Sequence, residues 1–416
     1  MISTAAGWGW RPGRGTATIL LLSALLAGWL FTPTWATERG VDAKDYYAAA
    51  SLANRGGNPY DPAEQGAEQD RLFNKPSDVS PGQAGYARAP YGYPPLFTLL
   101  LRRAMPLGFD RFYLLTLALL TAAGLLGMEA LLHVVGWQRR WLARAFFLAS
   151  APMALSLFVG NPSPLLLLGW AGALLLVRKG RPFLGGILLT LCLLKLPVGL
   201  PAAFALLVAP GTGSLMLGLG LAVGSGAVAG LQLLLTGADA TVSWLHALGG
   251  YTSGLGPGGG SAFAQSGLAG VPALFLDHVP TALAVALALL LIGTMMAWAW
   301  RRLATMHQEV SPDLILGVIV VAAVGATPYL HLNDLVILAL PLLLLAQTAP
   351  TVIARITELA WFIGIPAQLF LLGIAAITLH FRPAFGSAGI GVLLLLLLLL
   401  SLPIAARPSG ALEPGS

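Results

Sequence analysis

Long apolar stretches separated by short polar turns fill most of the chain, and they predict a bundle of membrane-spanning helices. A helix that crosses about 30 Å of hydrocarbon needs roughly 20 mostly apolar residues. The pattern predicts twelve spans, at residues 16–35, 111–136, 142–158, 163–177, 182–195, 199–209, 214–235, 280–300, 313–328, 335–349, 358–380 and 386–406. The spans at 163–177, 182–195 and 199–209 are short and could be tilted or re-entrant. Residues 94–109 are a further candidate, for a half-helix that dips into the membrane.

The first span follows two arginines and ends in Thr34-Trp35-Ala36, which resembles a signal-peptide cleavage site. Its apolar core is longer than the 7 to 15 residues typical of a signal peptide. We therefore expect the segment to be retained as a signal anchor.

The positions of lysine and arginine predict the orientation, because short cytoplasmic loops carry an excess of positive charge. With the amino terminus in the cytoplasm, twelve basic residues fall on the inner side, and only Lys195 and Arg382 fall in short outer turns. Both termini are then cytoplasmic. The outer face carries two larger loops, about 36–110 and 236–279, and nine of the 17 acidic residues lie in the first. The chain, 1–416, is expected to be one polytopic domain of the cytoplasmic (inner) membrane.

Composition strengthens the membrane interpretation. Hydrophobic residues make up 57% of the 416 positions and charged residues only 10%, against about 25% charged residues in ordinary globular domains. This excludes a soluble enzyme, a disordered tail and a fibrous repeat. The net charge is +6, but no basic run alternates with aromatic residues, so no nucleic-acid partner is expected. A single cysteine, Cys192, gives no disulfide framework and no cysteine-rich metal site.

Two carboxylates follow the first span directly, at the expected membrane surface. Asp42 and Asp45 precede Tyr46, Tyr47 and a small-residue stretch that is expected to be helical. A carboxylate at this position could act as a general base toward a hydroxyl group. The alternative is a helix cap, because an aspartate before a helix stabilises its first amide groups.

Two arginines lie later in the same outer loop. The segment 91–107 joins an aromatic and proline-rich turn to an amphipathic stretch that contains Arg102 and Arg103. It is typical of an interfacial helix. The arginines could also approach a lipid phosphate, and the two interpretations are compatible.

Lys195 interrupts an apolar stretch near the outer end of its predicted span, just before Pro197. A charge at mid-membrane costs about 2.5–3.5 kcal/mol on insertion scales, so we expect a partner anion, for which a lipid phosphate is a natural candidate.

In the outer turn at 159–162, Asn161 is explained adequately as a helix cap, as is the neighbouring Ser163.

His331 and Asp334 lie at the outer end of two further spans. A histidine three residues before an aspartate can hydrogen-bond it, and one His with one Asp falls short of the three protein ligands of a zinc site. We expect a hydrogen-bonding pair that lines a cavity and no bound cofactor, although the sequence leaves a divalent metal open.

Glycines form two further patterns. Gly220, Gly224, Gly226 and Gly230 give two GxxxG spacings within one span, a helix-packing pattern. Residues 254–261, GLGPGGGS, are expected to form a flexible outer loop, because no strand precedes them and no GK[ST] follows as a phosphate loop would require.

Taken in order, these segments resemble the integral-membrane glycosyltransferases of family 87, within the GT-C fold group. The resemblance runs from about residue 40 to 345. It departs from the family pattern at Asn333, where a tyrosine is usual, and at Gly160-Asn161, where Gly-Gln is commoner. The motifs that carry it are D-x-x-x-Y-Y-x-A-A at 42–50, G-x-x-x-Y-D-P near 57–62, Y-P-P at 93–95, GN-x-x-x-L at 160–165, RKGRPFLGGILLTLCLLKLPVGL at 178–200, Q-S-x-x-G at 265–270 and PYLHLNDLVIL at 328–338.

The resemblance implies an all-α GT-C bundle that transfers a sugar, mannose in part of the family, from a polyprenyl-phosphate donor to a glycolipid or glycan acceptor. Asp42 would be the catalytic base, with Asp45 as the fallback. Lys195, with Arg102 or Arg103, would stabilise the phosphate. The remaining candidates would shape the sugar or acceptor pocket, with Asn161 in the adjoining outer turn: Tyr46, Tyr47, His331 and Asp334.

Two other classes of membrane protein also have polar residues at membrane depth. A transporter or lipid-sugar flippase is disfavoured, since no duplicated halves are visible and the acids gather in an outer loop. A glycan polymerase would be expected to have arginine-rich outer loops, whereas 236–279 contains neither lysine nor arginine.

Overall fold

The computed structural model describes residues 39–73, 91–137, 140–209, 211–253, 312–325 and 330–348, with residues 21, 24, 25, 28, 290, 293 and 327 singly. Every regular element in this part of the chain is helical, and no strand occurs in it. Most of the spans expected at 16–35 and 280–300 lie outside the described residues, as do the spans at 358–380 and 386–406 and the glycine-rich segment 254–261. The helices are α2 (Val41–Asn54), α3 (Pro62–Phe73), α4 (Pro95–Arg102), η2 (Met105–Leu107), α5 (Phe109–Val134), α6 (Arg140–Ala149), α7 (Ala151–Val159), α8 (Ser163–Arg178), α9 (Pro182–Leu189), η3 (Thr190–Lys195), α10 (Leu196–Val208), α11 (Ser214–Ser253), α13 (Pro312–Gly325), η7 (Leu332–Leu338) and α14 (Ala339–Thr348).

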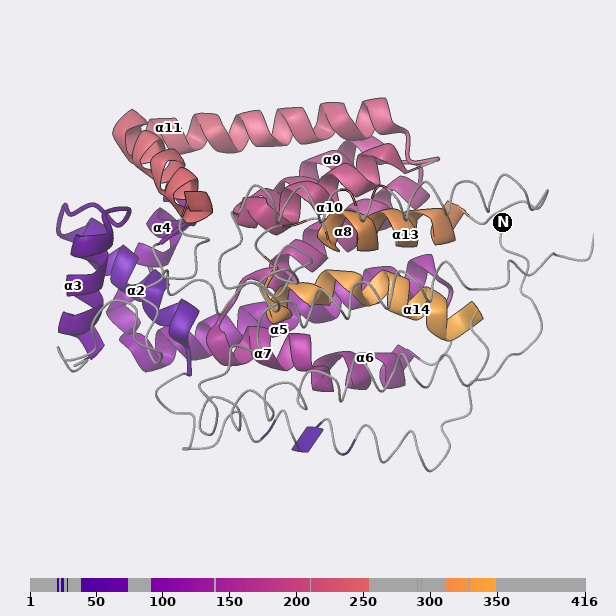
Figure 1. The fold of residues 1–416 in the computed structure, drawn as a ribbon, viewed down its shortest axis with the longest axis horizontal. Helices are drawn as coiled ribbons and strands as arrows, with labels where there is room; N and C mark the ends of the chain where they lie inside the picture. The colour runs from indigo at the N-terminus through magenta and orange to yellow at the C-terminus, as the bar shows by residue number, and fades with distance from the viewer. Residues whose placement is uncertain are drawn as a thin grey trace, which may run out of the picture.

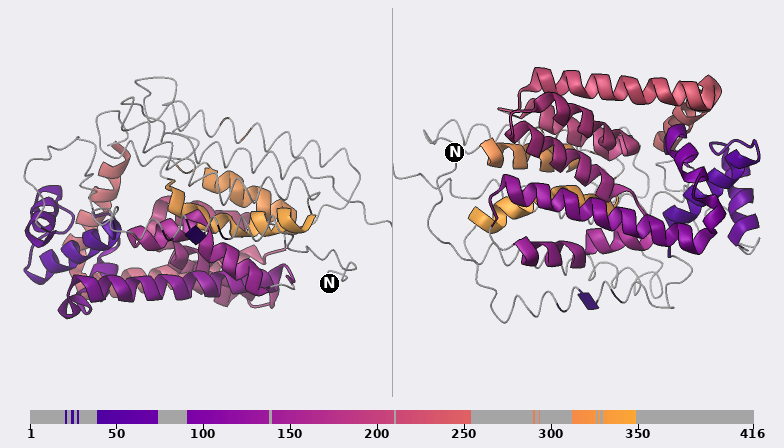
Figure 2. Two further views of the ribbon diagram at one scale, coloured as in Figure 1. Left: turned by 90° about the horizontal axis from the view of Figure 1, so that it is seen from below. Right: turned by 180° about the vertical axis from the view of Figure 1, so that it is seen from behind.

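Most of the helices run side by side along the long axis of the molecule, and α2, α3 and α4 gather at one end of this bundle (Figures 1 and 2). Helix α5 packs on α8, α8 on α9, and α9 on α11. Trp170 and Leu167 of α8 are fully buried between these helices. The short helices at the end of the bundle come from the region between the expected first and second spans.

Three helices in the described residues are long and apolar enough to cross a membrane by length and composition: Phe109–Val134, Pro182–Val208 and Ser214–Leu248. A fourth is added if the bent pair α6 and α7 counts as one span. An all-helical fold with such segments is compatible with a membrane glycosyltransferase. The count of twelve spans stays a prediction.

The expected span 142–158 is not one straight helix but two, bent by 55° between α6 and α7. The break falls at Ser150, whose backbone is extended with ψ 142°. Pro152 lies in the first turn of α7. Proline lacks an amide hydrogen and is tolerated at a helix start but not inside a helix, so the helix restarts here.

The segment Pro182–Val208 folds back on itself at Lys195. A straight helix of this length would separate its ends by about 40 Å, yet the Cβ position of Gly213, five residues beyond it, lies 3.3 Å from the Pro182 side chain. A Cβ at Gly199 would overlap the carbonyl oxygen of Cys192. The backbone of Lys195 is non-helical, at φ −130° and ψ 80°. The segment is therefore a helical hairpin with Lys195 at its turn, so it reaches the length of a membrane span by residue count and composition but not as one straight helix.

Helix α11 extends through the boundary expected near residue 235. It bends at Gly237, where φ is 82°, and continues to Ser253 beside α4 (Figure 1). The second outer loop expected at 236–279 thus begins as a helix. Within α11, Gly220 and Gly224 pack against the backbone of α9 as their spacing predicts, whereas no described atom lies within 4 Å of the Cβ positions of Gly226 and Gly230.

A buried ion cluster holds α3 on α2. The carboxylate of Glu68, on α3, is buried and accepts hydrogen bonds from Ser51, Arg55 and Arg71. Burial raises the pKa of Glu68, but the hydrogen bonds and positive charges around it outweigh burial and lower it below 4.5. This cluster fixes α3 against the face of α2 and so helps to hold α2 in place.

Candidate active site

The first turn of α2 is anchored on the turn between α7 and α8. The amide of Gly40 donates a hydrogen bond to the carbonyl oxygen of Phe158 (2.8 Å), and the Tyr113 hydroxyl donates to the same oxygen (2.8 Å). Gly160 follows with φ 81°, and a Cβ there would lie 2.8 Å from the Cβ of Ala43. Only glycine fits this left-handed and crowded position. The close approach brings the residue before Ala43, Asp42, to the α7–α8 turn.

Asp42 meets Asn161 at this contact. The side-chain amide of Asn161 donates a hydrogen bond to Oδ2 of Asp42 (2.6 Å). The carbonyl oxygen of the same amide accepts a hydrogen bond from the backbone N–H of Ser163 (3.1 Å), the first residue of α8. Asn161 therefore accepts the first backbone N–H of α8 and orients Asp42 at the same time.

The hydroxyl group of Ser163 connects this pair to the η7 segment. It lies within hydrogen-bond distance of both Asn161 Oδ1 and Asp334 Oδ1. Because a hydroxyl carries one proton, it donates to one of these oxygens at a time. The amide of Asn333 lies 3.5 Å from both Ser163 Oγ and Asp334 Oδ1, so α8 and η7 meet through polar groups.

Lys195 forms an ion pair with Asp334. Its Nζ lies 2.6 Å from Oδ1 of Asp334, and the side chains are 11% and 0% exposed. The protein itself thus supplies an anion for this lysine, across 139 residues of sequence. Either charge alone would be costly in a low-dielectric environment, so the loss of one partner would destabilise the protein.

His331 and Asp334 form a reciprocal cap at the start of η7. Oδ2 of Asp334 accepts the backbone N–H of His331 (3.0 Å), and the His331 side chain accepts the backbone N–H of Asp334. Burial and the charge of Lys195 lower the pKa of His331 to about 4, against the opposing effect of Asp334. The imidazole is therefore neutral at neutral pH.

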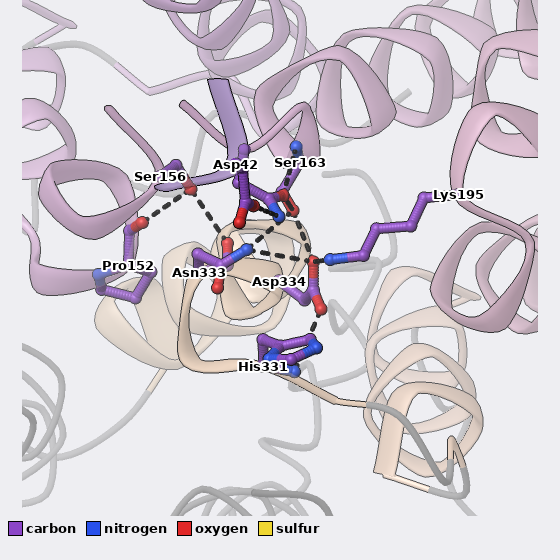
Figure 3. A network of polar contacts seen from close by, with 9 residues as sticks. Asp42, Pro152, Ser156, Ser163, Lys195, His331, Asn333 and Asp334 are labelled. Atoms are coloured by element: carbon purple, nitrogen blue, oxygen red, sulfur yellow. Dashed lines mark hydrogen bonds and ion pairs between the residues drawn. The ribbon is translucent and has the colours of Figure 1, made fainter. Parts of the chain in front are cut away.

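Figure 3 shows the resulting network, with Asp42 approaching from α2, Lys195 from the hairpin turn and Asp334 from η7. Ser156 of α7 extends it, because its hydroxyl lies near the carbonyl oxygens of Pro152 (2.8 Å) and Asn333 (3.1 Å). Four stretches that are distant in sequence thus converge on one polar centre: the start of α2, the α7–α8 turn, the hairpin turn and η7.

The electrostatic environment of Asp42 is mixed. Its side chain is partly exposed, and burial is still the largest influence, raising its pKa above 3.8. Attraction to Lys195 and the hydrogen bond from Asn161 lower the pKa, while repulsion from Asp334 raises it. The carboxylate is therefore more basic than a free aspartate, which suits a general base.

The neighbours of Asp42 on α2 have other partners. Asp45 is buried against α3, where it accepts a hydrogen bond from the Gln69 side chain. Tyr47 packs its ring against Phe109 and donates a hydrogen bond to the carbonyl oxygen of Met105 (3.3 Å). Tyr46 lies in an aromatic cluster with Tyr91, Tyr93 and Phe97. These contacts lie on α3, on η2 and α5, and on α4 with the turn before it.

The two candidate arginines lie at the other end of α2. Arg102 donates a hydrogen bond to the side chain of Asn54. Asn54 follows Asp42 by twelve positions on α2, a separation of about 18 Å along the helix axis. Arg103 is exposed. The structure therefore groups Asp42, Asn161, Lys195, His331 and Asp334 of the predicted residues, and leaves both arginines outside that group.

The sequence did not indicate that three further residues belong to the network. Ser163 was expected only as a helix cap, Asn333 only as a departure from a family pattern, and Ser156 was not singled out. A serine at the start of a helix gives no signal that it bridges to a distant aspartate. In the described residues no group of three or more His, Cys, Asp or Glu side chains is placed to hold a metal ion.

Comparison with known proteins gives one family. The family model of glycosyltransferase family 87 matches residues 91–328, which is more than half of the chain. No curated protein and no solved structure matches. The matched range includes Asn161, Ser163 and Lys195, whereas Asp42, His331 and Asp334 lie beyond its ends.

Proposed function

The chain belongs to glycosyltransferase family 87, and from this premise we propose that it transfers a hexose, mannose by the resemblance, from a polyprenyl-phosphate donor to a glycolipid or glycan acceptor. Family membership makes it a membrane glycosyltransferase. The proposal adds the donor, the acceptor class and the residues. It also adds the place: the outer face of the cytoplasmic membrane, with both termini in the cytoplasm.

The proposed reaction is a single inverting displacement at the anomeric carbon of the donor sugar. The acceptor oxygen forms the new bond to this carbon as the bond from the carbon to the phosphate oxygen breaks. The acceptor proton passes to the carboxylate of Asp42, and the electrons of the broken bond stay on the phosphate oxygen. Polyprenyl phosphate leaves as the anion, so its departure requires little protonation.

Asp42 suits the role of base for two reasons. Its raised pKa favours proton acceptance. Asn161 donates its hydrogen bond to Oδ2, so the proposed proton acceptor is Oδ1. A base must lie within hydrogen-bond reach of the proton that it removes, and a fixed carboxylate meets this condition more often than a mobile one.

Lys195 is the proposed electrostatic partner of the leaving phosphate. It lies at the turn of the hairpin, and Asp334 fixes its ammonium group in the same network as Asp42. A positive charge fixed beforehand stabilises charge that develops on the phosphate without reorganisation. The observation that carries the proposal is this juxtaposition of a candidate base and a fixed cation in one hydrogen-bonded network.

The proposal is tested with the purified protein in proteoliposomes that contain polyprenyl-phosphate-mannose and a membrane glycolipid extract. Transfer is expected to yield a mannosylated acceptor and an equal amount of free polyprenyl phosphate. Protein-free liposomes are the control. Movement of intact donor between leaflets without cleavage of the sugar–phosphate bond would instead identify a flippase and contradict the proposal.

A further inference from the structure

Within the part of the chain that the structure describes, the hydroxyl group of Tyr46 is buried and has no hydrogen-bond partner. The residue is 2% exposed, and no described group forms a hydrogen bond with its oxygen. Tyr93 approaches closely enough to affect the pKa of this hydroxyl, which burial raises, but without the geometry of a hydrogen bond. Buried tyrosine hydroxyls usually find a partner, and an unsatisfied one lowers the stability of the fold.

Other tyrosines of the same cluster do have partners. Tyr60 donates a hydrogen bond to the carbonyl oxygen of Tyr93 (2.9 Å), and Tyr91 and Thr98 share one between their hydroxyl groups (2.9 Å). The cluster is therefore able to satisfy its polar atoms. Tyr46 differs from them, because its ring is packed like a core residue while its hydroxyl group forms no hydrogen bond with a described residue.

The position of Tyr46 relates it to Asp42. The two residues are four apart on α2, so their side chains leave the same face of the helix one turn apart. Asp42 is near enough to raise the pKa of the Tyr46 hydroxyl. A molecule with one hydroxyl group at Asp42 would extend past Tyr46 if it continued along this face.

Aromatic rings pack around the ring of Tyr46 on the α4 side. The ring centroid of Tyr46 lies 4.9 Å from that of Tyr93 and 5.5 Å from that of Phe97, both in edge-on contact. Binding sites for small polar molecules combine aromatic walls with a few well-placed polar atoms. A sugar ring, with apolar C–H faces and hydroxyl groups at its rim, fits this combination.

We propose that Tyr46 is a specificity-determining residue that hydrogen-bonds a hydroxyl group of the acceptor sugar, next to the hydroxyl that Asp42 deprotonates. The inference rests on the proposed function for the role of Asp42, but the binding of a sugar at Tyr46 can be measured without any transfer. The cost of the unsatisfied hydroxyl group in the free protein is then recovered when the acceptor binds.

The test compares Tyr46→Phe with Tyr60→Phe in the full chain. The probes are methyl α-mannoside, methyl α-glucoside and methyl α-arabinofuranoside, and the readout is the midpoint of thermal unfolding in detergent with and without each glycoside. Tyr46→Phe is expected to melt at or above the wild-type temperature without sugar, because it removes an unsatisfied group. It is also expected to lose most of the stabilisation that the preferred glycoside gives the wild type.

Tyr60→Phe is the matched control, since it loses a hydrogen bond in the same cluster. It is expected to melt lower than the wild type and to keep the glycoside response. The proposal is overturned if Tyr46→Phe melts as low as Tyr60→Phe, if it keeps the full glycoside response, or if no glycoside stabilises the wild type.

Kinetics provide the second readout where transfer is measurable. Tyr46→Phe is expected to raise the KM for the acceptor about tenfold or more while the KM for the donor stays within twofold. An unchanged acceptor KM contradicts the proposal. A wild type that binds glycosides through Tyr46 but transfers no sugar would leave this subsite standing and remove the proposed function.

Discussion

The side-chain amide of Asn161 donates a hydrogen bond to the carboxylate of Asp42 across 119 residues of sequence (2.6 Å). Asn161 also accepts the first backbone N–H of α8, that of Ser163. The carboxylate is thus fixed relative to a buried helix, although α2 itself belongs to the group of short helices at the end of the bundle (Figure 1).

The Asn161→Ala variant is expected to lower the rate of sugar transfer at least tenfold, because Asp42 loses its orientation. The hydrogen bond from Asn161 lowers the pKa of Asp42, so its removal raises that pKa. The acidic limb of the pH profile of kcat/KM, where Asp42 becomes protonated, is therefore expected to move to higher pH. Asn54→Ala, at the far end of α2, is the control, and an acidic limb that does not move contradicts the account.

Gly160 is expected to tolerate no side chain. The Gly160→Ala variant pays about 1–2 kcal/mol for a left-handed alanine, and its Cβ also pushes Ala43 and the start of α2 away. Gly136→Ala is the matched control, since Gly136 has φ 67° and no described atom within 4 Å of its Cβ position. Unfolding temperature and transfer rate should fall further in Gly160→Ala. Equal effects of the two changes would show that the contact with α2 is unimportant.

Lys195 and Asp334 are expected to be coupled in stability. Removal of one partner of a buried ion pair leaves a charge uncompensated and costs about 3–5 kcal/mol. The single variants Lys195→Met and Asp334→Asn should each lower the unfolding temperature strongly, and the double variant should be less destabilised than the sum of the two. Thermal unfolding of all four proteins forms a double-mutant cycle, and strictly additive effects would contradict the pairing.

Glu68 is expected to make the contact between α2 and α3 pH-dependent. Its pKa is lowered in the folded protein from the ordinary value of 4.5, so its stabilising contribution is complete above that pH and is lost as the pH falls through the folded value. The difference in unfolding temperature between wild type and Glu68→Gln should therefore shrink below pH 4.5. A difference that is constant with pH would mean that the ion cluster contributes little.

Within the described residues the sequence indicated the apolar helices α5, α8 and the first part of α11, because length and hydropathy are local properties. It also indicated that residues 182–195 and 199–209 are short and could be re-entrant, and in the structure they form the two arms of a hairpin. The bend at Ser150 and the helix beyond Gly237 were not predicted. At each site the sequence contains a residue that can interrupt a helix, but the direction in which the chain continues depends on packing against other helices.

Individual members of the polar network were easier to single out from the sequence than their partners. Lys195 was noticed because a charge in an apolar segment needs an anion, but the sequence pointed to a lipid phosphate and gave no sign that Asp334 pairs with it. The residue pattern alone did not separate Asp42 from Asp45, and only the family resemblance ranked Asp42 first. They differ only because α2 turns one toward Asn161 and the other toward Gln69 of α3, and this rotation is set by tertiary contacts.

The comparison of Asp42→Asn with Asp45→Asn tests the central claim most directly. Both changes replace a carboxylate by an amide of the same shape on one helix, and transfer from polyprenyl-phosphate-mannose is measured at matched amounts of folded protein. If Asp42 is the base, Asp42→Asn lowers the transfer rate by about 10²–10⁴-fold, and Asp45→Asn keeps most of it. Full transfer activity of Asp42→Asn would contradict the account. So would a loss of activity in Asp45→Asn while Asp42→Asn stays active.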